Sequence, residues 1–359
     1  MKKIGIVTFH RALNYGAVLQ GYALQRTITS LGAKCDIVDY ICPRITHDYK
    51  PFRVEKKGFL KSFAKSCVMC RRRAKRRDAF QSFFNNCIVK SKKQYTPENI
   101  SQAKNDYDLF ISGSDQVWSA HCVGFDPAYF LTFADSHQKY SYAASFANTQ
   151  LPDYRIEEYK KRLADFQQYS VREESGVKLV KDLTGKDAYT HLDPSLLLSA
   201  DEWSEIAVRK LQQPYILIYT ANPPISLVEF AKKLSEEKNM PIYYINDAPH
   251  PVKNGINYIV APSVEEFVGY FKYASYVVTN SFHGTAFSTI FNKSMFVELK
   301  NKSGRNIRSE GLLQLLGIQR EIVNGNATET EIDWEKVNQK LVDCTADSKK
   351  YLSDIINQG

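Results

Sequence analysis

A histidine and a glycine at the junction of an apolar strand and an apolar helix are the residues best suited to chemistry. Residues 276–279 (YVVT) predict a buried strand, and residues 280–285 (NSFHGT) lead from it into a helix that continues to Phe291. His283 therefore stands where the helix dipole favours an anion and where a side chain that titrates near neutral pH can exchange a proton. Gly284 leaves space for a ligand above the backbone. A histidine packed in the core is the alternative at this position.

The loop after the first predicted strand carries hydrogen-bonding groups. Residues 4–9 (IGIVTF) predict that strand, and Asn14 and Tyr15 stand at the start of the helix that follows. Gly16 permits a ligand to approach the backbone closely. The spacing GxGxxG does not occur in this loop, so the loop does not indicate dinucleotide binding.

A second loop combines small residues with an acid and an indole. Residues 112–118 (SGSDQVW) follow the predicted strand 107–111 and include Ser114. Asp115 is suited to accept hydrogen bonds from sugar hydroxyls or to act as a general base, and Trp118 offers an apolar face to a pyranose ring. A helix N-cap is the alternative role for Asp115, and the two roles are compatible.

A cation follows an apolar stretch at the edge of the first half of the chain. Arg172 begins the sequence REES at residues 172–175. Its planar guanidinium is suited to bidentate binding of a carboxylate or a phosphate. A solvated surface arginine is the alternative.

These loops need a scaffold of parallel strands, because ligands collect at the carboxyl ends of the strands in open parallel sheets. Strand and helix patterns alternate along the first 200 residues and again from about residue 215 to residue 299. We therefore predict an α/β fold with two doubly wound, Rossmann-like domains that face a cleft. The N-terminal domain spans residues 1–200, and the C-terminal domain spans residues 201–359 and ends in helices.

Composition excludes several classes of protein. The chain has 359 residues, of which 43% are hydrophobic, enough to bury the cores of about two domains. No apolar run approaches the roughly 18 residues of a membrane span, and the run at residues 4–9 is too short for a signal peptide. The seven cysteines are scattered, which predicts reduced thiols in a cytoplasmic protein. No paired metal-ligand spacing accompanies them, so we expect no metal.

Positive charge is concentrated in one segment. Residues 53–93 contain 14 Lys or Arg against Glu55 and Asp78, a balance of 14 − 2 = +12 within a net charge of +9. Apolar residues recur there every three to four positions, which predicts a basic insertion of amphipathic helices in the first domain. One interpretation is a solvated basic face. The other is peripheral contact with anionic lipid at the inner membrane face or with a pyrophosphate-linked lipid acceptor. No nucleic-acid recognition motif accompanies the charge, so we expect no nucleic-acid partner.

Six short motifs occur in an order that is typical of one family. They are NYGAVLQ at residues 14–20, SGSDQVW at 112–118, YAASF at 142–146, VRE at 171–173, DPS at 193–195 and NSFHG at 280–284. This ordered set, spread over nearly the whole chain, resembles the polysaccharide pyruvyl transferase family. The resemblance implies a two-domain fold similar to that of GT-B glycosyltransferases.

By that resemblance, the chain transfers pyruvate from phosphoenolpyruvate to a pair of sugar hydroxyls, as a ketal, during the biosynthesis of a surface polysaccharide. The C-terminal domain is then the donor side and the N-terminal domain the acceptor side. Phosphoenolpyruvate is a co-substrate, and the resemblance implies no cofactor. The acceptor is a glycan, either free or linked to a lipid, and the sequence indicates neither its sugar nor the oligomeric state of the protein.

The resemblance also implies roles for individual residues. His283 matches the family's essential histidine, and Arg172 matches its donor-binding arginine. Arg308 aligns with an arginine common upstream of a Leu-Leu pair in the family, and it joins Ser281 and Gly284 in the expected donor site. Some members carry an arginine where Ser281 stands. The expected acceptor side consists of Asn14, Tyr15, Gly16, Ser114, Asp115 and Trp118.

The sequence also allows two other functions. One is a GT-B-type glycosyltransferase that uses a nucleotide sugar, because one fold supports several chemistries. The other is a non-catalytic glycan-binding or assembly subunit of the same fold, which the serine at position 281 favours. Binding of phosphoenolpyruvate or of a nucleotide sugar distinguishes the enzymes from each other.

Overall fold

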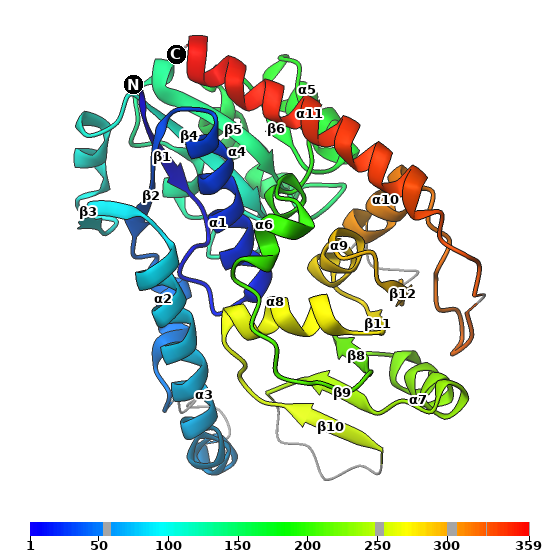
Figure 1. The fold of residues 1–359 in the computed structure, drawn as a ribbon. Coiled ribbons are helices and arrows are strands. Elements are labelled where there is room, and N and C mark those ends of the chain that lie inside the picture. Colours follow the sequence, from blue (N-terminus) through cyan, green and yellow to red (C-terminus); the bar gives the residue numbers. More distant parts are fainter. Residues whose placement is uncertain (53–58, 248–254, 300–306, 328, 359) are drawn as a thin grey trace. The chain divides into compact units, whose positions relative to one another are not determined.

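The computed structural model describes residues 1–359 apart from 53–58, 248–254, 300–306, 328 and 359 (Figure 1). The chain divides into two units. The first consists of Met1–His47, Phe84–Leu198 and Leu341–Gly359, and the second consists of Asp48–Phe83 and Ser199–Lys340. Each unit is built around a parallel sheet, as the alternation of strand and helix patterns predicts.

Among the described residues, the first unit has a sheet of seven parallel strands in the order β3-β2-β1-β4-β5-β6-β7. The strands are β1 (Lys3–Val7), β2 (Lys34–Tyr40), β3 (Lys90–Tyr95), β4 (Leu109–Asp115), β5 (Lys139–Ala144), β6 (Ser170–Val171) and β7 (Tyr189–Thr190). The strand order reverses between β1 and β4. The loops that follow these two strands therefore flank the topological switch point, where open α/β sheets bind their ligands.

Helices connect these strands. They are α1 (Tyr15–Ser30), α2 (Pro43–Thr46), α4 (Ile156–Leu163) and α5 (Glu174–Thr184), with α3 (Phe59–Cys87) and α11 (Trp334–Gln358) contributing residues to both units. Short 3₁₀ turns occur at His47–Tyr49, Ile100–Asn105, Pro127–Phe130, Ser136–Gln138, Asp153–Arg155 and Pro194–Leu197. In α1 the predicted helix is confirmed: Asn14 caps its start, and Gly32, at a φ of 91°, follows its end in the left-handed conformation that favours glycine.

The second unit has, within the described ranges, a sheet of five parallel strands in the order β10-β9-β8-β11-β12. The strands are β8 (Ile216–Tyr219), β9 (Ile242–Ile245), β10 (Ile256–Ile259), β11 (Tyr276–Thr279) and β12 (Ser294–Val297). Its helices are α6 (Ala200–Ser204), α7 (Leu227–Lys238), α8 (Val264–Tyr273), α9 (Phe282–Ile290) and α10 (Ile307–Leu316). The strand order reverses between β8 and β11, which puts a second switch point at the ends of these strands.

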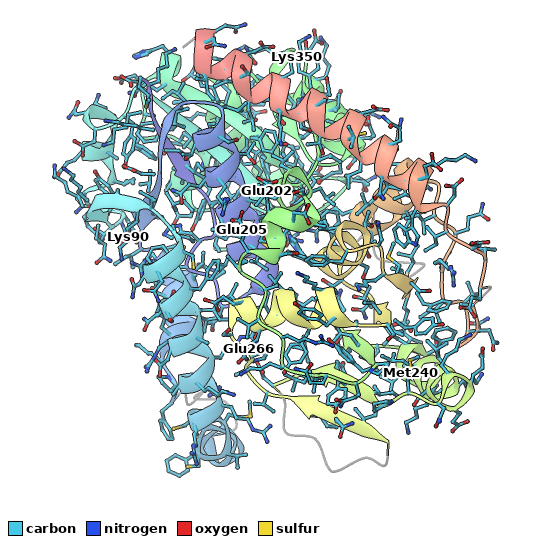
Figure 2. All side chains as sticks on the ribbon, viewed as in Figure 1. Lys90, Glu202, Glu205, Met240, Glu266 and Lys350 are labelled. Carbon is cyan, nitrogen blue, oxygen red and sulfur yellow. The ribbon has the colours of Figure 1, made fainter. Side chains whose placement is uncertain are left out.

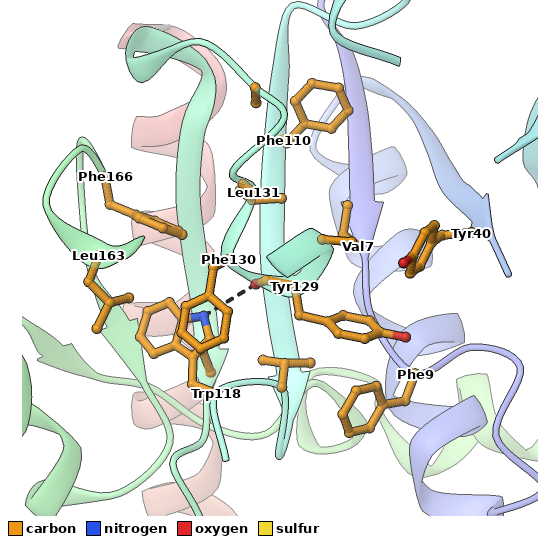
Figure 3. Packing of buried hydrophobic residues seen from close by; sticks show 14 of the residues in the cluster. Val7, Phe9, Tyr40, Phe110, Trp118, Tyr129, Phe130, Leu131, Leu163 and Phe166 are labelled. Atoms are coloured by element: carbon orange, nitrogen blue, oxygen red, sulfur yellow. Dashed lines mark hydrogen bonds between the residues drawn. The ribbon is translucent and has the colours of Figure 1, made fainter. Parts of the chain in front are cut away.

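Aromatic side chains fill much of the core of the first unit (Figure 3). Trp118 is fully buried, and its ring centroid lies 5.3 Å from that of Phe146 and 5.5 Å from that of Phe166. Its indole N–H donates to the carbonyl of Tyr129 at 3.3 Å, so the buried polar group is satisfied. Charged side chains such as Lys90 and Lys350 lie on the outside (Figure 2).

The C-terminal helix corrects the predicted domain boundary. We assigned residues 201–359 to the second domain, but Leu341–Gly359 belongs to the first unit. In α11, Leu352 is fully buried, and the hydroxyl of Tyr351 donates to the carbonyl of Ser141 at 3.0 Å. This contact joins residues 210 positions apart, so no local pattern in the sequence reveals it.

The basic segment also differs from its prediction. A long helix, α3, occupies most of it, and Asp48–Phe83 belongs to the second unit instead of the first. Strand β3 follows and was not predicted, because its sequence KSKKQY has few apolar residues. Residues 53–58, at the start of the predicted insertion, lie outside the described residues.

Within the part of the chain that the structure describes, no helix has both the length and the apolar character required to cross a bilayer. The seven cysteines are free thiols, as predicted.

Leu352→Ala tests the assignment of α11 to the first unit. The substitution leaves a cavity among buried side chains, so we expect the first unit to lose about 2–5 kcal/mol of stability. Val342→Ala changes a 61% exposed position of the same helix and serves as the matched control, with an expected effect below about 0.5 kcal/mol. Hydrogen exchange in β4 and β5 gives the local readout. Equal protection of these strands in both variants contradicts the assignment.

Candidate functional site

The predicted site residues form two groups, one in each unit. Residues 14–16 follow the loop after β1, and residues 114–118 follow or end β4, at the switch point of the first sheet. Residues 281–284 follow β11, at the switch point of the second sheet. Arg172 belongs to the first group and Arg308 to the second.

Asp115 is the last residue of β4. Its φ of 67° lies in the left-handed region, which aspartate adopts more readily than most residues. Its Oδ1 accepts a hydrogen bond from the N–H of Gln116 at 2.9 Å, and 14% of its side chain is exposed. Turns, and no helix, follow at residues 116–126, so the helix N-cap role considered for Asp115 is wrong.

Arg172 follows β6 and is enclosed by carboxylates. Its Nη1 donates to Oδ2 of Asp193 at 2.6 Å, and its Nη2 lies 3.6 Å from Oδ1 of Asp115. Burial disfavours the charged guanidinium, but the charges of Asp193, Asp115 and Glu173 outweigh this effect and raise the pKa of Arg172 above its usual value. With a side chain only 2% exposed, Arg172 is not a solvated surface residue. The carboxylates of Asp193 and Asp115 both belong to the same unit as Arg172.

Asp193 is a member of this group that the sequence did not assign as a site residue. Its side chain is fully buried, and its Oδ1 accepts hydrogen bonds from the N–H and the hydroxyl of Ser195 at 3.0 and 2.7 Å. The hydroxyl of Ser114 lies 3.3 Å from its Oδ2. The available signal was the DPS motif at residues 193–195. Asp193 therefore ties the end of β4 and the loop after β6 to the turn at Pro194–Leu197.

Burial removes three residues from the predicted acceptor surface. Tyr15, Ser114 and Trp118 are 1%, 0% and 0% exposed. Trp118 belongs to the aromatic core, and the hydroxyl of Ser114 donates to the carbonyl of Ala143 at 3.0 Å. These side chains build the loops and offer no face to a sugar, which corrects their predicted role.

Asn14 and Gly16 stand at the start of α1. Asn14 is exposed, and its Oδ1 accepts a hydrogen bond from the N–H of Ala17 at 3.2 Å. Gly16 is buried in the first turn of the helix. Of the six residues predicted for the acceptor side, Asn14 and Asp115 have side chains that reach the surface.

A buried charged cluster lies beside the loop after β1. Arg11 donates to both carboxylate oxygens of Asp39, at 2.6 and 2.8 Å, and Nε2 of His10 lies 3.5 Å from Asp39 Oδ1. Burial alone raises the pKa of Asp39, but the neighbouring ring of His10 and the charge of Arg11 outweigh it and lower this pKa to about 2. Sequence patterns also missed Asp39, because it lies in β2 while its partners His10 and Arg11 lie in the loop after β1.

His283 is the second residue of α9 and directly follows the junction with β11, as predicted. The residue is 7% exposed. Its ring packs edge-on against Phe282, with centroids 5.2 Å apart and an interplanar angle of 83°. The histidine is thus held almost completely inside the unit, at the N-terminal turn of a helix and at a switch point.

Ser281 and Gly284 shape the start of α9. Ser281 is its N-cap, and its hydroxyl oxygen accepts a hydrogen bond from the N–H of Gly284 at 3.4 Å. A Cβ added at Gly284 would lie 2.1 Å from Oγ1 of Thr279, so only glycine fits there. The space beside Gly284 is filled by Thr279, which corrects the ligand-binding role predicted for this glycine.

Arg308 lies in the first turn of α10 and is partly exposed. Its guanidinium carbon is 5.9 Å from the ring centroid of Phe282. The ring of Phe282 also contacts that of His283. Arg308 and His283 thus both pack against Phe282, and their role in a donor site stays a prediction.

Asn280 fixes the loop after β8, a role that its place before the histidine did not reveal. Its Oδ1 accepts a hydrogen bond from the N–H of Ala221 at 3.0 Å, and its Nδ2 donates to the carbonyl of Asn222 at 3.0 Å. The loops on both sides of the second switch point are therefore joined by one amide.

Glu298 occupies the N-terminus of α7. It is 2% exposed, and its Oε1 accepts hydrogen bonds from the N–H groups of Ser226 and Leu227, both at 2.7 Å. A carboxylate thus satisfies the position at α7 where an anion is most stable. Because Glu298 fills the position at α7, the N-terminus of α9 is the better place for a ligand anion at this switch point.

Among the residues that the structure describes, no group of three or more His, Cys, Asp or Glu side chains is arranged to hold a metal ion.

The strand orders of the two sheets and a similar solved structure from Listeria monocytogenes define the class of fold. A protein assigned as a UDP-N-acetylglucosamine 2-epimerase from Listeria monocytogenes has a TM-score of 0.50 at 10% identity, over 98% of this chain and 90% of that chain. The UDP-GlcNAc 2-epimerase from Methanocaldococcus jannaschii gives 0.48 at 12% identity, over 99% of both chains. A heptosyltransferase from E. coli gives 0.38 at 12% identity, over 95% and 99%. The protein has a GT-B-like fold with two Rossmann-like units.

The sequence gives the family within this class. The model for polysaccharide pyruvyl transferases matches residues 14–297, well over half of the chain. The chain belongs to the polysaccharide pyruvyl transferase family. No curated protein matches it.

Asp193→Ala tests the buried ion pair of the first unit. The substitution leaves the Arg172 guanidinium buried without its 2.6 Å partner, so we expect the unfolding free energy to fall by about 3–5 kcal/mol. Asp187→Ala removes a pair with Lys181 whose carboxylate is 79% exposed, and it is expected to cost less than about 1 kcal/mol. Denaturant unfolding of both variants gives the comparison. If Asp193→Ala lowers the unfolding free energy no more than Asp187→Ala does, the pair of Arg172 and Asp193 does not hold the loops.

Proposed function

We propose that this protein transfers pyruvate from phosphoenolpyruvate to two neighbouring hydroxyls of a glycan sugar and releases phosphate. The observation that carries the proposal is the family match over residues 14–297, which includes Asp115 and Arg172 of the first unit and His283 of the second. Its support from the geometry is the position of His283, at a switch point and a helix N-terminus. The acceptor is a glycan of a surface polysaccharide, either free or linked to a lipid.

The donor is a small polyanion, so its binding requires positive potential. In the second unit, the N-terminal turn of α9 supplies the positive end of a helix dipole, and Arg308 supplies a cation near Phe282. Glu298 already occupies the equivalent position at α7. We therefore assign the donor to the group formed by His283, Ser281 and Arg308, with Ser281 acting through its cap of α9.

The reaction delivers one proton to carbon and one to the departing phosphate, and it removes one proton from each of the two sugar hydroxyls. Protonation of the donor's methylene carbon creates an oxocarbenium-like centre at the neighbouring carbon, and the first sugar hydroxyl attacks that carbon and loses its proton. The bond to the phosphate oxygen then breaks, and the second hydroxyl attacks the same carbon and loses its proton, which closes the ketal. His283 is the group proposed to donate a proton or to stabilise the departing phosphate. No electron transfer occurs, so the proposal includes no cofactor besides the donor.

The first unit is proposed to receive the acceptor. Asp115 combines a carboxylate with a partly exposed side chain at the switch point, which suits it to accept a hydrogen bond from a sugar hydroxyl. Arg172, with its ion pairs to Asp193 and Asp115, is proposed to hold that carboxylate in place. Asn14 is the other exposed polar group at this edge. Arg172 acts as a positioning residue in this scheme, although the resemblance assigns it to the donor.

His283→Ala is expected to lower kcat for phosphate release from phosphoenolpyruvate by about 10²- to 10⁴-fold, because a positioned acid typically contributes that much. His283→Gln, which keeps a polar side chain of similar size, guards against a loss of folding. His137→Ala changes an exposed histidine of the first unit and is the control. Phosphate release is measured with an acceptor glycan. Turnover of both His283 variants at the rate of the unchanged protein contradicts the proposal.

Arg308→Ala is expected to weaken binding of phosphoenolpyruvate about tenfold, equivalent to about 1.4 kcal/mol. Arg209→Ala removes an exposed arginine of the same unit and is expected to change the affinity by less than twofold. Thermal shifts measure both, since a ligand at 100 times its Kd stabilises the folded protein by about 2.7 kcal/mol. Stabilisation by UDP- or GDP-sugars, with none by phosphoenolpyruvate, supports a glycosyltransferase instead. Acceptor binding without turnover on either donor supports a non-catalytic glycan-binding subunit.

A further inference from the structure

Helix α3 contains a concentration of positive charge that its own stability does not require. Residues 71–77 (RRRAKRR) hold six cations and no carboxylate. Three pairs of like charge stand four positions apart in this segment, at 71 and 75, 72 and 76, and 73 and 77. Each such pair destabilises an isolated helix by a few tenths of a kcal/mol. Locally unfavourable patterns of this kind are expected at functional sites.

One face of this segment contacts the second sheet at the carboxyl ends of its strands. Arg72 Nη1 donates to the carbonyl of Asp247 at 3.4 Å, and Arg76 forms an ion pair with the Asp247 carboxylate. Lys75 Nζ donates to the carbonyl of Val260 at 3.2 Å. Asp247 lies shortly after β9, and Val260 directly follows β10. The carboxyl edge of a parallel sheet is where ligands bind, so the helix brings its cations to a functional edge.

These cations are held in defined positions. The guanidinium carbon of Arg76 lies 5.4 Å from the ring centroid of Phe80, which is 3% exposed. Asp247 also accepts a hydrogen bond from the N–H of Ala261 at 2.6 Å, so the residues directly after β9 and β10 are held to each other. The side chain of Arg76 is 27% exposed. Part of the basic face of α3 therefore contacts the second unit, while Arg71 and Lys75 are exposed.

We propose that Arg72, Lys75 and Arg76 form a binding site for a diphosphate group. Asp247 compensates part of their charge and orients them, while the six cations of residues 71–77 keep the local balance positive. Arginine is suited to planar, bidentate binding of phosphate oxygens, and lysine adds a point charge. A diphosphate supplies several negative oxygens within the reach of three side chains on adjacent turns of one helix.

This site is separate from the group around His283. In the sheet order, β9 lies two strands from β11, and β10 lies three strands from it. At about 4.8 Å per strand, the two positions are roughly 10–14 Å apart. A three-carbon donor does not reach both. The diphosphate bound at α3 therefore belongs to another substrate. Under the proposed function it is a diphosphate attached to the acceptor glycan, and only this identification rests on the proposed function.

Direct binding tests this site without requiring turnover. Inorganic pyrophosphate is titrated into the full-length protein by calorimetry at low ionic strength, and phosphoenolpyruvate and UDP are titrated separately. We expect Arg72→Gln with Lys75→Gln to weaken pyrophosphate binding at least tenfold. We expect the affinity for phosphoenolpyruvate to change by less than twofold in the same variant. UDP tests a nucleotide-linked diphosphate, and a prenyl diphosphate in detergent tests a lipid-linked one.

Arg77→Gln is the matched control, because Arg77 belongs to the same helix and pairs with the neighbouring Asp78. We expect it to change pyrophosphate affinity less than twofold, and a circular dichroism spectrum verifies that α3 is retained in every variant. An equal loss in the control and the double variant overturns the site, because the effect is then one of general charge. Unchanged binding in the double variant also overturns it.

A membrane surface is the competing partner for a basic helix. Sedimentation with vesicles of anionic and of zwitterionic lipid measures this interaction. Binding to anionic vesicles that needs residues 71–77, together with no measurable affinity for pyrophosphate, UDP or prenyl diphosphate, overturns the diphosphate site in favour of lipid. Failure of the proposed function has a different signature: pyrophosphate binds while phosphoenolpyruvate neither binds nor releases phosphate.

Discussion

Parallel pairing of the strands is the constraint on which both candidate groups depend. In a parallel sheet the carboxyl ends of all strands lie at one edge. Where the strand order reverses, the connections after two neighbouring strands run in opposite directions and leave a crevice at that edge. In the first unit this happens between β1 and β4, and in the second between β8 and β11. Asp115 and His283 therefore come from distant parts of the chain, yet each stands at the same kind of position in its sheet.

Buried charged side chains at these edges are paired with opposite charges or backbone N–H groups, and these pairs fix the conformation of the loops. Arg172 is held by Asp193 and Asp115, and Glu298 accepts the N–H groups at the start of α7. An unpaired charge at comparable depth costs several kcal/mol, so each of these groups restricts the loop that contains its partner. The loops are thus positioned mainly by polar contacts within a unit, while Trp118 and its aromatic neighbours hold the first unit's core.

Hydrophobic periodicity was sufficient to predict α1, the strands of the second sheet and the junction before His283, because these features depend on neighbouring residues. The features that sequence patterns missed depend on residues far apart. The hydroxyl of Tyr351 binds the carbonyl of Ser141, 210 positions away, and this contact joins the C-terminal part of α11 to the first unit. Trp118 looks like a sugar platform in its own loop, but the surrounding fold buries it. Gly284 provides close packing against Thr279, a contact that the pair His-Gly does not reveal.

Electrostatics favours a division of roles between the units. The candidate group of the first unit contains two carboxylates, Asp115 and Asp193, compensated by Arg172, so it has no surplus of positive charge for a polyanion. A neutral hydroxyl that must lose a proton is better suited to it. The group of the second unit combines a helix N-terminus with Arg308, and α3 adds further cations at the same edge of that sheet. Positive potential suited to anionic groups is therefore concentrated in the second unit, whereas the candidate group of the first unit is better suited to neutral hydroxyls.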